Sequence, residues 1–242
     1  MLHRRVTFPV ALCAAVIALA GFSSGALALT VSSIQTDAFD GANNLDDTAN
    51  VTRVTVGGIQ YRNLIVPTAA DIDGGGASPG AANLYRGQNF AGPQPTSLTD
   101  VLVGDADITT GYTDPSFSTP VNVMFGQTIS GTAGRAEVFL FDITTGDTWT
   151  VQAITGGTAA APVLGGSASF TANNIGLNAD TRRANGTNIG VQDLFGFGVD
   201  INSDLGEASI IGVRVTSNGA DPSAVVASSG TVDSLTAASA LK

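Results

Sequence analysis

Residues 137–154 carry the clearest fold signal in the chain: Glu137-Val-Phe-Leu-Phe-Asp-Ile143, then Thr144-Thr-Gly-Asp147, then Thr148-Trp-Thr-Val-Gln-Ala-Ile154. In the last stretch every second residue from Trp149 to Ala153 is apolar, and this period of two predicts a β-strand. The first stretch carries apolar side chains on both faces, which indicates a strand in the middle of a two-layer packing. The short Gly-containing link between the two stretches predicts a β-hairpin.

Similar segments follow one another along most of the chain, separated by clusters of Gly, Asn, Asp and Pro. A second hairpin is predicted around residues 202–207, between two segments in which large apolar residues alternate with small or polar ones. Because helical periodicity is nearly absent, we predict an all-β fold, an antiparallel, jelly-roll-like β-sandwich in a single domain. The expected strands are Leu29–Gln35, Val51–Val56, Gln60–Val66, Val121–Ile129, Ala136–Ile143, Thr148–Ile154, Ser167–Thr171, Leu194–Ile201 and Ile210–Thr216.

The first 28 residues have the order of a secretory signal peptide. Arg4 and Arg5 give a positive start, an apolar run extends from Val10 to Ala20, and Ala26-Leu27-Ala28 fits a cleavage site. The apolar run is shorter than the roughly 20 residues that span a bilayer. We therefore expect an exported protein without a transmembrane anchor, extracellular or associated with the cell surface of a bacterium.

This interpretation divides the chain into three parts. Residues 1–28 are expected to be cleaved, and residues 29–228 to form the β-sandwich with an irregular loop region at about 71–120. Residues 229–242 are rich in small side chains and are expected to form a flexible C-terminal tail.

The chain's only histidine, His3, and its only cysteine, Cys13, lie in the predicted signal peptide. Without them, the remaining chain has no disulfide, no thiolate nucleophile, no Cys/His zinc site and no histidine base. The only lysine is Lys242, so serine–lysine schemes are not expected either. We therefore expect a protein that is not an enzyme.

A carboxylate-dependent, carbohydrate-active enzyme is the alternative, and it needs two acids that face each other across a sugar. Glu137 and Asp142 are five residues apart on one predicted strand, so their side chains point to opposite faces. Only acids brought together from distant segments would give such a pair.

All 20 acidic residues but only eight of the ten basic ones follow Ala28, which leaves this part of the chain with a net charge of −12. Nucleic acid and anionic lipid are therefore not expected as partners, because both require clustered basic residues. Of the acids, 18 are Asp, which is favoured in turns and is also a common calcium ligand.

One segment has the oxygen spacing of a calcium loop: Asp200-Ile-Asn202-Ser-Asp204-Leu-Gly-Glu207. Asp200, Asn202, Asp204 and Glu207 are the candidate calcium ligands. The segment departs from that loop because Leu205 stands where a Gly is expected, and Ile211 where a Glu is expected. An Asp-rich turn without any cofactor is the other interpretation. If calcium binds, the protein would be a calcium-stabilised surface assembly subunit.

Three aromatic residues in the irregular region are the candidate ligand-binding residues: Tyr85, Phe90 and Tyr112. They lie near polar side chains such as Arg86 and Asn89, as in sugar-binding sites that combine aromatic stacking with polar contacts. The alternative is that they anchor long loops to the core. Trp149 alternates with apolar residues and is expected to be a core residue.

The segment Phe195-Gly-Phe-Gly-Val-Asp-Ile-Asn-Ser-Asp-Leu-Gly-Glu-Ala-Ser-Ile-Ile-Gly-Val-Arg-Val, followed by Gly219-Ala-Asp-Pro, resembles the last hairpin of the uncharacterised bacterial PEP-CTERM or exosortase-associated surface proteins. The chain lacks the Pro-Glu-Pro motif, apolar span and Arg cluster of their sorting tail. The resemblance implies an extracellular matrix, adhesion or surface role, with polysaccharide or other copies of the chain as partners and without a known activity.

Overall fold

A computed structural model describes residues 29–37, 44–73, 80–104, 106–113, 119–144, 147–218 and 221–234. The predicted signal peptide lies outside these residues. Of these described residues 61% are in strands and 3% in the helix, and two antiparallel sheets pack against each other. The prediction of an all-β sandwich is therefore confirmed.

The elements follow one another with a single short helix among the strands of the described part. In chain order they are β1 (Leu29–Thr36), β2 (Asn44–Leu45), β3 (Val51–Val56), β4 (Ile59–Arg62), β5 (Ala69–Ile72), β6 (Leu84–Gly87), α1 (Leu98–Leu102), β7 (Gly111–Tyr112), β8 (Val121–Ser130), β9 (Val138–Ile143), β10 (Thr148–Thr158), β11 (Ala161–Thr171), β12 (Asn173–Arg183), β13 (Asn188–Val199), β14 (Ser209–Asn218), β15 (Asp221–Ala227) and β16 (Val232–Ser234).

The smaller sheet has the strand order β11-β10-β14-β8-β5. The larger sheet runs β16-β4-β3-β1-β13-β12-β6-β7, with β9 paired to β13 and β15 paired to β9. The short strand β2 pairs parallel with β12, and every other strand pair of the described chain is antiparallel.

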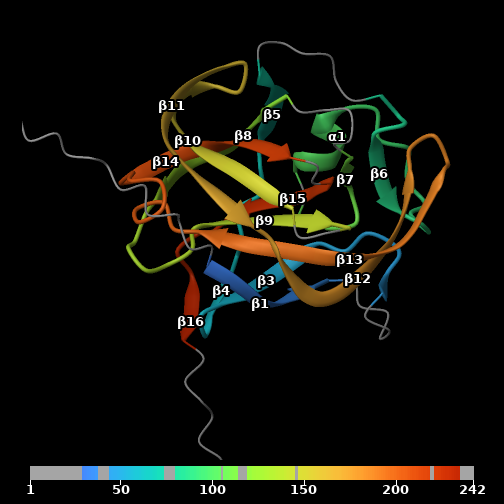
Figure 1. Ribbon diagram of the computed structural model, residues 1–242, viewed down its shortest axis with the longest axis horizontal. Helices are drawn as coiled ribbons and strands as arrows, with labels where there is room; N and C mark the ends of the chain where they lie inside the picture. The colour runs from blue at the N-terminus through green and yellow to red at the C-terminus, as the bar shows by residue number, and fades with distance from the viewer. Residues whose placement is uncertain are drawn as a thin grey trace, which may run out of the picture.

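The first hydrophobic core lies between the two sheets, where β8, β10 and β14 face β9 and β13 (Figure 1). The rings of Trp149 and Phe170 flank Phe197, with centroid distances of 5.7 Å and 5.1 Å to it. Trp149 is completely buried, as expected from its place in the alternating segment.

A second core lies on the other side of β9, because the larger sheet folds back on itself. Strand β1 pairs with β13 through Leu29 and Thr30 and then with β3 from Val31 onward, so β3 and β4 come to lie under β9 (Figure 1). The ring centroid of Tyr61 in β4 is 5.0 Å from that of Phe139 in β9. All six residues of β9 are buried, which agrees with the prediction of a strand covered on both faces.

The first predicted hairpin is wrong, although both of its strands exist. Strand β9 pairs with β13 and β15, whereas β10 pairs with β11 and β14, so the link between β9 and β10 crosses from one sheet to the other. The physical reason is that each strand already has two neighbours in its own sheet. A short Gly-containing link fits a corner between sheets as well as a hairpin turn.

The second predicted hairpin is wrong for the same reason, because β13 lies in the larger sheet and β14 in the smaller one. The connecting residues Ile201 and Leu205 are buried in the first core between the sheets. The glycines of β13 permit close packing against the neighbouring segments. A Cβ atom on Gly196 would lie 2.9 Å from the Phe141 ring, and one on Gly198 would lie 2.7 Å from Ala136 Cβ.

The region expected to be irregular, 71–120, contains short strands and long connections, together with helix α1. Ser97 caps this helix, since its hydroxyl accepts a hydrogen bond from Asp100 N–H while Asp100 caps the Ser97 N–H in return. The strand β12 was not predicted. At the C-terminal end, β16 pairs with β4, so residues expected in the tail join the sheet as far as Ser234.

Candidate functional site

The predicted calcium loop, residues 200–207, is held by hydrogen bonds from its own carboxylates. Asp200 Oδ1 accepts from the backbone N–H groups of Asn202 (3.0 Å) and Ser203 (2.8 Å). Its Oδ2 accepts from the N–H of Gly134. Asp204 Oδ2 accepts from the N–H of Asp200 at 2.9 Å. Carboxylates arranged in this way cap backbone donors, as Asp side chains commonly do in turns.

The other two candidate ligands make separate contacts. Glu207 Oε1 accepts from the N–H of Gly166 in β11 at 2.9 Å, and Asn202 is exposed. Within the described ranges, no three Asp, Glu, His or Cys side chains are grouped so that they could hold a metal ion. The hydrogen bonds therefore favour the turn interpretation, and calcium binding stays a prediction.

Replacing Asp204 with Ala separates the two interpretations. If Asp204 acts as a cap on Asp200, Asp204→Ala lowers the free energy of unfolding by about 1 kcal/mol, whether calcium is present or not. Thermal unfolding in millimolar CaCl₂ and in EDTA measures this. A calcium-dependent rise of the midpoint in the unaltered protein that is lost in Asp204→Ala would instead establish a calcium site.

The three candidate ligand-binding aromatics lie in different surroundings. Tyr85 belongs to the second core and Tyr112 to the first, and both are buried. The Tyr85 hydroxyl donates to the backbone carbonyl of Asp221 at 3.0 Å. These two rings anchor β6 and β7 to the cores, whereas Phe90 is only partly buried and lies in the connection that follows β6.

Phe90 lines a hollow of about 470 Å³ between the end of β6, the 93–96 segment and helix α1. Its walls combine apolar and polar groups, namely Thr48, Arg86, Phe90, Pro93, Gln94, Pro95, Thr96, Asp100, Asp107 and Thr110. A pocket with an aromatic ring and a few polar groups is the usual composition of a small-molecule or sugar site. Of the three predicted aromatics, Phe90 therefore supplies the candidate site.

The hollow also contains a buried arginine that sequence reasoning did not select. Arg86 is 2% exposed, its guanidinium carbon lies 4.7 Å from the Phe90 ring centroid, and its Nη1 donates to the carbonyl of Gly92 at 2.8 Å. Burial, together with the positive charge of Arg182, lowers the pKa of Arg86. Nothing in the sequence indicates that Arg86 is buried, because an arginine in a loop-rich region is normally solvated.

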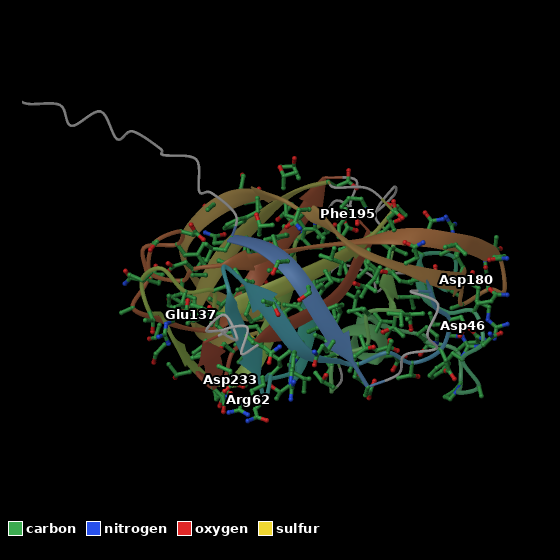
Figure 2. The ribbon with its side chains drawn as sticks, turned by 90° about the horizontal axis from the view of Figure 1, so that it is seen from below. Asp46, Arg62, Glu137, Asp180, Phe195 and Asp233 are labelled. Atoms are coloured by element: carbon green, nitrogen blue, oxygen red, sulfur yellow. The ribbon has the colours of Figure 1, made fainter. Side chains whose placement is uncertain are left out.

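A second, smaller cleft of about 270 Å³ lies at the opposite end of the molecule, beside Glu137. Figure 2 shows Glu137 at one end, near Arg62 and Asp233, and Asp46 and Asp180 at the other. Glu137 Oε1 accepts from Thr132 N–H at 2.7 Å, and its Oε2 accepts from Ile201 N–H at 3.0 Å. Among the described residues lining the cleft, Glu137 is the only acid. Its carboxylate therefore fixes two backbone segments and has no facing acid there.

In the part of the chain that the structure describes, no helix is both long and apolar enough to cross a membrane. Comparison of the chain with protein-family models, with curated proteins and with solved structures gave no match. The candidate site therefore has to be interpreted from its own residues.

Proposed function

We propose that this protein is a non-catalytic, exported β-sandwich that binds polysaccharide at the cell surface or in the extracellular matrix. The binding site in this proposal is the hollow beside Phe90. The observation that carries the proposal is a partly exposed aromatic ring in a hollow of about 470 Å³, among hydroxyl, amide and charged side chains.

The composition of the hollow supports a sugar ligand. An aromatic ring offers an apolar face to the C–H groups of a sugar, while Thr48, Gln94 and Thr110 offer hydrogen bonds to its hydroxyl groups. The absence of His and Cys from residues 29–242 supports a binding role over a catalytic one. The predicted signal peptide supports a location outside the cytoplasm.

The test is affinity electrophoresis of the purified protein through gels that contain neutral and acidic polysaccharides. We expect retardation in at least one gel, and we expect Phe90→Ala to weaken that binding about tenfold by removing the stacking face. Val163→Ala is the matched control, because it truncates an exposed apolar side chain on β11 of the smaller sheet. Equal binding by the two variants, or no retardation by any polysaccharide, would contradict the proposal.

The carboxylate-dependent enzyme is the competing function, and the same polysaccharides test it through the release of reducing ends. Release that Glu137→Gln abolishes in a folded protein would replace the binding proposal with a hydrolase. The cleft beside Glu137 supports this alternative less well, since both carboxylate oxygens already accept backbone hydrogen bonds.

A further inference from the structure

We propose that the hollow beside Phe90 recognises a sugar carboxylate, so that its ligand is a polysaccharide containing uronic acid. This inference rests on the proposed function and adds the chemical class of the ligand. Arg86 would bind the carboxylate, and the polar groups at the other side of the hollow would bind the hydroxyl groups of the same sugar.

Arg86 is the first observation behind this inference. It is buried, yet no carboxylate oxygen lies within ion-pair distance of it in the described part of the chain. Its Nε atom has no hydrogen-bond partner there either. A buried charge without a partner is costly, whereas a guanidinium that meets a carboxylate gains a strong, often two-pronged hydrogen bond. The Arg86 guanidinium is therefore available to bind an anionic ligand.

A second arginine stands directly beside the first. Arg182 of β12 is the register partner of Arg86 in β6, so the two side chains leave the same face of the sheet. The Nε atom of Arg182 is also buried without a partner among the described residues. Seven arginines follow Ala28, and two of the others, Arg62 and Arg214, do form ion pairs with Asp side chains. Arg86 and Arg182 differ from these in that they are direct neighbours with buried Nε atoms that lack a partner in the described part of the chain, and an anion would relieve their mutual repulsion.

The acids in the hollow favour a sugar acid over a simple polyanion. Asp100 Oδ2 accepts from Thr96 and Ser97, and Asp107 Oδ1 accepts from Ala49 and Thr109, so both carboxylates are held in place. They would repel a second negative charge but can accept hydrogen bonds from hydroxyl groups. A uronic acid provides one carboxylate for Arg86 and hydroxyl groups for Asp100 and Asp107.

The experiment compares two soluble polymers that differ in the carboxylate alone, polygalacturonate and its methyl ester, by isothermal titration calorimetry with the purified protein. We expect the ester to bind about tenfold more weakly. Arg86→Lys keeps the charge but loses the planar fork, and should remove most of the preference for the acid. Arg53→Lys is the matched control, because Arg53 lies on β3 and bonds Gln35 there. If Arg86→Lys does not fold, the comparison of acid and ester on the unaltered protein still tests whether the carboxylate is recognised.

Three other outcomes would contradict the inference, and each of them has a different meaning. Equal binding of acid and ester, both dependent on Phe90, would leave the proposed function standing and remove the role of the carboxylate. Binding of poly-glutamate as tightly as polygalacturonate would show that charge alone is recognised. If neither these polymers nor neutral polysaccharides bind, the proposed function and this inference fail together.

Discussion

Glu137→Gln is expected to lower the free energy of unfolding by about 2 kcal/mol at neutral pH, although it changes one atom. Both oxygens of Glu137 accept backbone hydrogen bonds, from Thr132 before β9 and from Ile201 after β13. A glutamine has one oxygen, so its NH₂ group would face the other N–H, and a buried donor would lose its acceptor. Urea unfolding followed by circular dichroism measures the loss.

Glu207→Gln is the matched control for this substitution. Glu207 Oε1 accepts a hydrogen bond from one backbone group, the N–H of Gly166, and the amide oxygen of glutamine can replace it. We expect a loss of less than about 1 kcal/mol. Equal losses in the two variants would mean that the paired acceptor role of Glu137 is incorrect.

Glu137 also makes the stability of the protein depend on pH. Burial raises the pKa of Glu137 to about 7, against the lowering effect of the two N–H groups and of Arg135. Between the ordinary carboxyl pKa of about 4.3 and a pKa near 7, the folded protein holds a proton that the unfolded chain has released. The extra proton stabilises the folded protein. This stabilisation is fully present below the ordinary carboxyl pKa, and it is lost as the pH rises through the folded-state pKa of about 7.

We therefore expect the unaltered protein to become less stable from pH 5 to pH 8, by at most about 3 kcal/mol from Glu137. In Glu137→Gln this part of the slope should disappear. A slope of the same sign should remain, because burial also raises the pKa values of Asp107, Asp142 and Asp204, and that of Asp142 well above its ordinary value. Parallel pH curves for the two proteins would refute the assignment.

The sequence predicts the strands better than their partners. Alternation identifies β10 and β14, and apolar residues on both faces identify β9, because these side chains have to lie in a core. Alternation also runs through β12, where Ile175, Leu177 and Ala179 stand at every second position and contact the second core. The strand was missed because Asn, Asp, Arg and other small or polar residues make up the rest of it.

Strand pairing was mispredicted at both proposed hairpins because it is decided by distant segments. β9 needs β13 and β15 beside it, and these follow it by roughly 50 and 80 residues.

The candidate site also depends on contacts between segments that are distant in the sequence. Phe90 could be selected as an aromatic in a polar loop, but the burial of Arg86 depends on its packing against β12 and the 90–92 segment. Local reasoning assigned Tyr85 and Tyr112 the same surroundings as Phe90, whereas long-range packing buries the first two.

The second large effect is expected at Trp149, where replacement by Ala should cost about 3–5 kcal/mol and lower the unfolding midpoint by roughly 10 °C. The side chain is 0% exposed and packs edge-on against Phe197, so its loss leaves a cavity between the two sheets. Thr150→Ala on the same strand is the control, because Thr150 is exposed and its loss should change stability by less than about 0.5 kcal/mol. Circular dichroism has to follow the unfolding, since Trp149 is the only tryptophan.

A folded Trp149→Ala protein of normal stability that no longer binds polysaccharide would mean that Trp149 contacts the ligand. Reduced stability with binding retained below the midpoint would establish that Trp149 joins the sheets and does not contact the ligand.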